Sequence, residues 1–207
     1  MELALKLASI FFTMILVDNY VLAKFLGICP FLGVSKKLDS AVGMSLAVTF
    51  VMVMATAATW PIYTYILSPE WAEGTSRDLG YLQTIVFILI IAILVQLLEN
   101  ILKKFIPTLY KSLGVYLPLI TTNCTILGVT ILNIDNGYNF MESIVCAAGA
   151  GIGFLVAMVL FSGVRRKVEE AVTPKCFEGL PITLVSAAVT SLSFMGFGGI
   201  IESIFHV

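Results

Sequence analysis

Two short stretches decide the fold: GICPFLGV at residues 27–34 and TNCTILGV at residues 122–129. Both contain the pattern Cys-x-x-Leu-Gly-Val, at an offset of 95 residues in a chain of 207. Because this offset is close to half the chain length, the pattern predicts an internal repeat. We expect one repeat over approximately residues 1–104 and a second over approximately 105–207, together forming a single domain.

The composition around these stretches is typical of a membrane protein. Hydrophobic residues make up 59% of the chain and charged residues only 12%, whereas soluble domains carry about 25% charged residues. Five uncharged runs reach the length of about 20 residues that crosses the hydrocarbon core of a bilayer. They cover residues 40–69, 79–98, 112–134, 143–164 and 179–201. A nucleic-acid-binding protein, a secreted disulfide scaffold and a soluble enzyme are therefore excluded.

The amino-terminal part has two shorter uncharged stretches, 7–17 and 25–35, each of 11 residues. The polar residues between them are Asp18, Asn19 and Lys24. A cleaved signal peptide is disfavoured, because the stretch lacks a basic beginning and a small-residue cleavage site. The pattern instead predicts a sixth membrane segment from about Leu3 to Leu32, interrupted around Gly27–Pro30.

The distribution of Lys and Arg predicts the orientation. Nine of the twelve fall in the connections after the first, third and fifth segments, whereas Lys6 and Arg77 lie in the other connections and Lys24 lies within the first segment. The nine are Lys36, Lys37, Lys103, Lys104, Lys111, Arg165, Arg166, Lys167 and Lys175. Since Lys and Arg accumulate on the cytoplasmic side, we expect a multi-pass protein of the cell (inner) membrane with both termini on the outer side.

Six crossings in two halves give three crossings per half. Because three is an odd number, the second half must enter the membrane from the opposite side. We therefore expect an all-α integral membrane protein with six transmembrane segments in two inverted three-segment repeats, the first segment of each repeat being broken. In such folds the broken helices meet near the bilayer midplane, so Cys29 and Cys124 should approach each other there.

Several roles are open to these two cysteines. A cysteine in a membrane helix is often a small apolar filler, the interpretation we adopt for Cys146, and a reduced cytosolic thiol is expected for Cys176. A disulfide between Cys29 and Cys124 would need demanding geometry. Haem is disfavoured because the single histidine, His206, lies at the chain end, and zinc would lack ligands. An iron–sulfur cluster needs four thiolates, so a second copy or a related partner would have to supply two.

Four stretches, two of which contain these cysteines, resemble the A-subunit family of Rnf-type electron-transport complexes, to which the E subunit of the sodium-translocating NADH–quinone reductase is closely related. They are DNYVLAKFLGICPFLGVSKK (18–37), LGVYLPLITTNC (113–124), YNFMES (138–143) and SFMGFGG (193–199). The resemblance covers essentially the whole chain.

The resemblance implies a ferredoxin–NAD oxidoreductase complex coupled to sodium or proton translocation. It implies a homologous membrane partner of opposite orientation, with two cysteines from each chain holding a [2Fe–2S] cluster near mid-membrane; here these are Cys29 and Cys124. FMN, nicotinamide and the other iron–sulfur clusters belong to other Rnf-type subunits. The chain has no Gly-rich dinucleotide fingerprint, which agrees with that division, and no complete active site is expected in this chain alone.

Polar residues near the cysteines give further candidates. Thr121, Thr122 and Asn123 are placed to donate hydrogen bonds to cluster sulfurs, or to satisfy freed backbone groups. Lys24 is a candidate cation near the cluster, and Asp18 a candidate ion-path residue, since ionisable groups at membrane depth usually serve such roles. Asp18 and Lys24 are six positions apart and would pair poorly in an unbroken helix.

Small residues predict close helix packing in the fifth segment, where Gly149, Gly151 and Gly153 lie close to Ala147, Ala148 and Ala150. Such residues let helix backbones approach in membranes.

Two other functions remain open from the residues themselves. A secondary transporter would use the same inverted repeat with a small-molecule site at the midplane. A purely structural anchor would tolerate alanine at both Cys29 and Cys124.

Overall fold

A computed structural model describes residues 2–35, 38–67, 82–105, 117–171, 174 and 176–196, and within these ranges the chain is helical, with no strand. The helices are α1 (Glu2–Leu16), α2 (Ile28–Val34), α3 (Leu38–Ile62), the π-helical turn η1 (Tyr63–Leu67), α4 (Gln83–Phe105), α6 (Leu117–Thr121), α7 (Cys124–Asp135), α8 (Phe140–Glu169) and α9 (Leu180–Met195).

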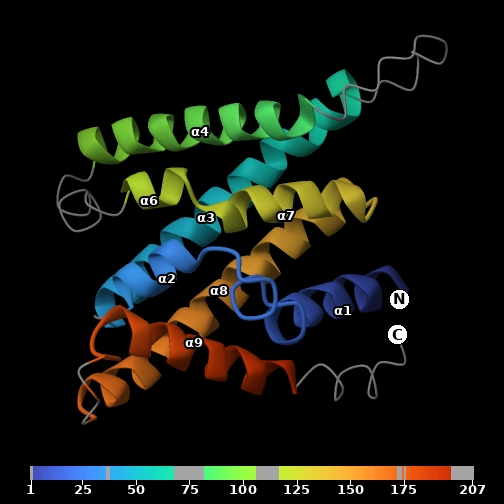
Figure 1. Ribbon diagram of the computed structural model, residues 1–207. Coiled ribbons are helices and arrows are strands. Elements are labelled where there is room, and N and C mark those ends of the chain that lie inside the picture. Colours follow the sequence, from blue (N-terminus) through green and yellow to red (C-terminus); the bar gives the residue numbers. More distant parts are fainter. Residues whose placement is uncertain are drawn as a thin grey trace.

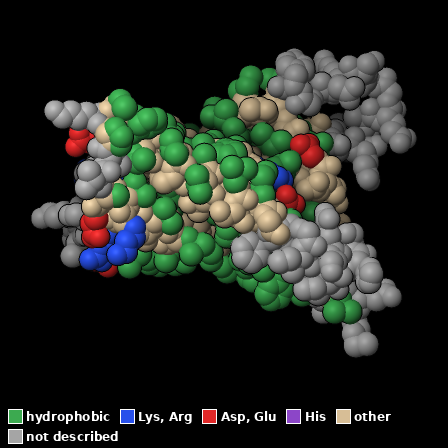
Figure 2. Space-filling view, turned by 60° about the horizontal axis from the view of Figure 1, so that its bottom comes forward, with side chains coloured by type: hydrophobic (Ala, Val, Ile, Leu, Met, Phe, Trp, Pro, Cys, Tyr) green, Lys and Arg blue, Asp and Glu red, His purple; other side chains and the backbone are tan. Residues whose placement is uncertain are grey.

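Three stretches within the described residues are long and apolar enough to cross a membrane: Leu38–Leu67, Gln83–Ile101 and Phe140–Glu169. On the face seen in Figure 2, charged side chains gather toward the two ends and leave a mainly uncharged zone between them. Large apolar side chains such as Leu46 and Phe50 of α3 are exposed instead of buried. The prediction of an all-helical membrane protein is therefore confirmed.

The helices run back and forth between two ends of the molecule (Figure 1). The ends of α2, α4 and α8 and the starts of α3, α6 and α9 lie toward the left of the view. The starts of α1, α4 and α8 and the ends of α7 and α9 lie toward the right. The long helices α3 and α8 cross obliquely between the others and make the most extensive contact between any two described helices.

The glycines of α8 allow its close contacts, as the sequence predicts. A Cβ on Gly153 would lie 2.9 Å from the Met14 carbonyl oxygen, and one on Gly149 would lie 3.1 Å from the Phe11 carbonyl oxygen, both in α1. A Cβ on Gly151 would lie 2.5 Å from a Thr49 side-chain carbon in α3. The small residues therefore divide between two neighbours, α1 on one face of α8 and α3 on another.

The first interruption lies earlier than predicted. Helix α1 ends at Leu16 and α2 begins at Ile28, so residues 17–27 form the break and Cys29 and Pro30 are helical. Pro30 is the third residue of α2, where the backbone N–H has no intrahelical acceptor, so proline is tolerated there. The predicted break around Gly27–Pro30 is wrong in extent for this reason.

The second interruption lies where the sequence indicates, within the run 112–134. Helix α6 ends at Thr121 and α7 begins at Cys124, so only Thr122 and Asn123 separate them. Asn123 is the N-cap of α7, and its side-chain oxygen accepts a hydrogen bond from the Thr125 backbone N–H. An N-cap side chain of this kind stabilises a helix that restarts after a break.

Candidate functional site

The two motif cysteines lie at the starts of two helices. Cys29 is the second residue of α2 and Cys124 the first residue of α7, and both are exposed on the surface of the chain. The backbone N–H of Gly27, the N-cap residue of α2, donates a hydrogen bond to Cys124 Sγ at 2.9 Å. The two motifs are therefore in direct contact, with α2 beginning against the first turn of α7.

Gly27 makes this contact possible through its backbone. Its φ is +80°, in the left-handed region that favours glycine. A Cβ at this position would lie 2.2 Å from Thr125 Oγ1 and 3.2 Å from Asn123 Oδ1. Sequence reasoning did not single out Gly27 as a functional residue, although its position directly before the first cysteine motif was the available signal.

Asn123 places an unpaired donor beside Cys124. Because its Oδ1 accepts from the Thr125 N–H at 3.1 Å, its Nδ2 group is the free end of the amide. Asn123 is only 4% exposed, and Nδ2 has no hydrogen-bond partner among the described residues, as is also true of Thr125 Oγ1. Buried polar atoms without partners are uncommon, so both atoms are hydrogen-bonding groups that the described residues leave unused.

A cavity of about 350 Å³ adjoins this point. Thr122, Asn123 and Cys124 line it from the break between α6 and α7, and Ile88, Ile91 and Ala92 line it from α4. The structure therefore places Thr122 and Asn123, two of the candidates predicted beside Cys124, on one cavity wall with that cysteine.

Lys24 and Asp18 form a second polar group, in the break between α1 and α2. Lys24 Nζ lies 3.8 Å from Asp18 Oδ1 and 4.9 Å from the centre of the Tyr20 ring. The poor pairing of Asp18 and Lys24 was expected for an unbroken helix, and the ion pair forms here because the chain is not helical between them. The ammonium group of Lys24 is thus directed to Asp18 and Tyr20.

Asn19 holds this break in place. It is fully buried, and its Nδ2 donates to the Gly153 carbonyl oxygen at 2.8 Å, while its Oδ1 accepts from the N–H groups of Val21 and Leu22. From α9, Ser191 Oγ donates to the Leu22 carbonyl oxygen. The irregular backbone therefore has polar partners inside the protein.

The remaining two cysteines differ from the motif pair in their surroundings. Cys146 of α8 is fully buried, as expected of a small apolar core residue. Cys176 is exposed in the connection between α8 and α9.

The thiols of Cys29 and Cys124 fit half of the ligand set of an iron–sulfur cluster. Within the described residues, no group of three or more His, Cys, Asp or Glu side chains could hold a metal ion. Both thiols are exposed, and Cys124 Sγ accepts a backbone N–H. Cysteine sulfurs are the usual protein ligands of iron–sulfur clusters. Because both are exposed, a second protein could approach them and complete a set of four.

Comparison with known proteins identifies the family. The family model described as "Rnf-Nqr subunit, membrane protein" matches residues 7–201. The A subunit of the Na(+)-translocating ferredoxin:NAD(+) oxidoreductase complex of Acetobacterium woodii is 54% identical over 94% of this chain and 98% of its own length. The A subunit of the ion-translocating oxidoreductase complex of Syntrophotalea carbinolica is 51% identical over 90% of this chain and 93% of its own. Its counterpart from Serratia proteamaculans is 50% identical over 91% of this chain and 94% of its own length. The resemblance seen in the sequence is thus confirmed, and the chain belongs to the Rnf-Nqr family of membrane-protein subunits.

Proposed function

We propose that this chain is a membrane subunit of an ion-translocating ferredoxin–NAD oxidoreductase complex and carries electrons across the membrane. The proposal is supported by the name of the Acetobacterium woodii relative, whose similarity extends over nearly the whole chain. The observation that carries the proposal is the contact between the two cysteine motifs, in which the Gly27 N–H donates to Cys124 Sγ. The chain would act as one part of an enzyme whose complete active site needs the other parts of the complex.

Cys29 and Cys124 would hold a [2Fe–2S] cluster together with two cysteines of a homologous membrane subunit of opposite orientation. When bound, such a cluster accepts and releases single electrons. The exposure of both thiols favours a shared site, because a site within one chain would be enclosed by that chain.

Gly27 and Asn123 would surround the sulfur atoms with hydrogen-bond donors. The Gly27 N–H already reaches Cys124 Sγ, and the Asn123 amide has an unpaired N–H group beside the same cysteine. Hydrogen bonds to cluster sulfurs are one of the factors that set the reduction potential of iron–sulfur clusters. Thr122 is a further candidate from the same cavity wall.

The fold that serves this role would be six transmembrane segments in two inverted repeats, approximately residues 1–104 and 105–207. Two observations support this arrangement. Each half contains a short helix that starts at or next to a motif cysteine, and successive helices run between opposite ends of the molecule (Figure 1). Both termini would then lie on the outer side of the inner membrane.

Asp18 is the candidate ion-path residue of this chain, for sodium or protons. Its side chain is 43% exposed and lies beside Lys24 in the break between α1 and α2, so a carboxylate is available at an irregular point of the first segment. Lys24 would influence the cluster only at longer range, because its ammonium group is directed to Asp18 and Tyr20. The other subunits of the complex would carry FMN and the remaining iron–sulfur clusters.

Replacement of single cysteines tests the proposal. In the purified complex, Cys29→Ser and Cys124→Ser should each remove the EPR signal of one reduced [2Fe–2S] cluster and lower the iron content by about two atoms per complex, the iron of one such cluster. Cys176→Ser is the matched control, because Cys176 is also exposed but lies in the connection between α8 and α9, outside both motif sequences, and it should leave both readouts unchanged. Wild-type iron and EPR signals in both motif variants would contradict the cluster assignment and favour a transporter or an anchor.

A further inference from the structure

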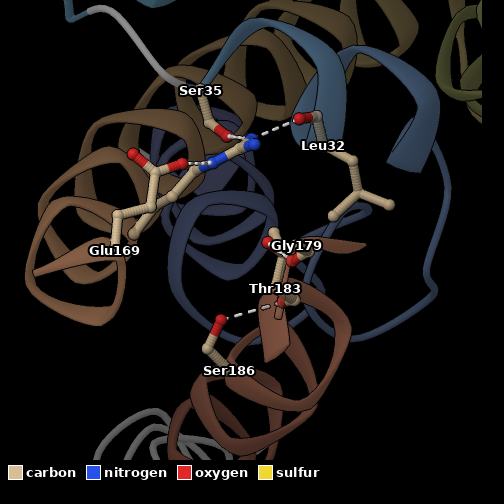
Figure 3. A network of polar contacts seen from close by, with 7 residues as sticks. Leu32, Ser35, Glu169, Gly179, Thr183 and Ser186 are labelled. Atoms are coloured by element: carbon tan, nitrogen blue, oxygen red, sulfur yellow. Dashed lines mark hydrogen bonds and ion pairs between the residues drawn. The ribbon is translucent and has the colours of Figure 1, made fainter. Parts of the chain in front are cut away.

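Arg165 of α8 carries a buried charge whose partners lie at the end of α2. Only 6% of the residue is exposed. Its guanidinium group donates to the Leu32 carbonyl oxygen, to Ser35 Oγ at 2.8 Å and to Glu169 Oε1 at 3.1 Å. Figure 3 shows Leu32, Ser35 and Glu169 converging on this group from separate directions. A buried guanidinium is stable only when it is paired in this way.

Two of these partners belong to the carboxyl end of α2. The Leu32 carbonyl is one of the last four in α2, which lack intrahelical partners, and Ser35 is the C-cap residue. Arg165 therefore caps α2 from another helix. Its positive charge also interacts favourably with the negative end of the α2 dipole.

Helix α2 depends on such outside contacts. It has seven residues, and its N-cap, Gly27, supplies no side-chain hydrogen bond. A helix this short is not stable alone, because its few hydrogen bonds do not offset the cost of helix nucleation. A second contact with α8 is the stacking of Phe31 on Phe161, with ring centres 4.1 Å apart. Phe161 and Arg165 are four positions apart and share one face of α8, so together they attach α2 to that helix.

We infer that Arg165 is a positioning residue for Cys29 and acts through α2. Cys29 lies one turn before Leu32 in the same helix, so the end that Arg165 holds and the turn that presents the thiol form one short rigid unit. Loss of the guanidinium contacts would leave the carboxyl end of α2 without its partners in α8. The Cys29 thiol would then no longer be held in one direction. This inference rests on the proposed role of Cys29 as a cluster ligand.

The first test measures the cluster in the purified complex. Arg165→Gln should change the g-values of the reduced cluster and alter its ratio of reduced to oxidised form at a fixed potential by about threefold or more, since cluster potentials respond to ligand surroundings. Ser35→Ala, which removes one acceptor, should cause a smaller change, and Arg165→Lys should restore part of the wild-type behaviour.

The matched control is Arg166→Gln. Arg166 is the neighbouring arginine with its own ion pair to Glu170 four residues on, but its side chain is 84% exposed, so wild-type spectra are expected.

The second test does not depend on the cluster. After iron is removed from the complex by a chelator, the alkylation rates of Cys29 and Cys176 are compared by mass spectrometry. Cys29 should react several-fold faster in Arg165→Gln than in wild type, while the exposed Cys176 serves as the internal reference. If Arg165→Gln fails to assemble, Ser35→Ala and Arg165→Lys decide the question with the same readouts.

Unchanged spectra, redox ratios and Cys29 alkylation in the variants that assemble would overturn the role of Arg165. An absent cluster signal in the wild-type complex would instead overturn the proposed function. In that case the alkylation rates still report whether Arg165 fixes the position of Cys29.

Discussion

Gly27 is the residue at which the two cysteine motifs touch, and its lack of a side chain is needed for that contact. Its left-handed φ of +80° would cost another residue about 1–2 kcal/mol. The 2.2 Å separation between a Cβ and Thr125 Oγ1 adds a steric conflict with a fully buried residue. Both effects would displace the Gly27 backbone N–H that donates to Cys124 Sγ.

Replacing Gly27 by alanine should therefore displace the start of α2 from α7. We expect Gly27→Ala to lower the iron content of the purified complex at least twofold and to lower its apparent Tm, both relative to wild type. Gly43→Ala is the control, since Gly43 lies in α3 and a Cβ there would meet nothing within 4 Å. A Gly27→Ala complex with full iron content and unchanged Tm would show that the hydrogen bond to Cys124 is dispensable.

Helix α8 contacts the interrupted first segment, α1 to α2, at three points along its length. Near its start Glu142 pairs with Lys6 of α1 at 2.7 Å, in its middle the Gly153 carbonyl accepts from Asn19, and near its end Arg165 binds the carboxyl end of α2. A continuous helix needs no such anchors. Because residues 17–27 are irregular, the contacts with α8 help to position both α1 and α2.

The contact between α1 and α8 can be tested at Gly153. Gly153→Ala places a Cβ 2.9 Å from the Met14 carbonyl oxygen and 3.2 Å from Asn19 Nδ2, so α1 must move away. Overpacking of this kind costs about 1–3 kcal/mol, and the apparent Tm of the complex in detergent should fall. Gly163→Ala in the same helix, where nothing lies within 4 Å of the added Cβ, should keep the wild-type Tm. Equal Tm values for the two variants would mean that α1 is not held closely at Gly153.

The element boundaries show what the sequence was able to predict. The interruption at Thr122 and Asn123 was predictable, because its cause is local: an N-cap asparagine directly before α7. The extent of the first interruption was not, because α2 accommodates Pro30 in its first turn and the irregular residues are held by Asn19, whose hydrogen bond reaches a carbonyl 134 positions away. The ion pair of Asp18 with Lys24 was missed for the same reason, since it forms only when the helix between them is absent.

At the scale of the whole molecule, composition and charge spacing were sufficient for the membrane class, because both depend on the solvent and not on particular contacts. The sequence predicted that the two cysteine motifs approach each other, because an odd number of membrane crossings in each half inverts the second repeat. In the structure the Gly27 N–H donates to Cys124 Sγ. The burial of Arg165 could not be predicted, because an arginine at the end of an apolar run is typical of a charged residue in a cytoplasmic loop. Its partners, Leu32 and Ser35, are more than 100 positions away.

The orientation of the molecule can be tested at the two ends of α8, the longest described helix, with 30 residues. Cys176 is exposed just beyond its carboxyl end, and Asn136 is exposed just before its start. Because Lys and Arg concentrate around residues 165–175, the positive-inside rule places Cys176 in the cytoplasm and Asn136 outside. A membrane-impermeant maleimide added to right-side-out vesicles should label Asn136→Cys but leave Cys176 unmodified, with inverted vesicles giving the opposite pattern. Mass spectrometry assigns each modified cysteine, and detergent-solubilised protein, labelled at both positions, is the control. Labelling of both positions from one side would mean that α8 does not cross the membrane, and a reversed pattern would mean that the termini lie inside.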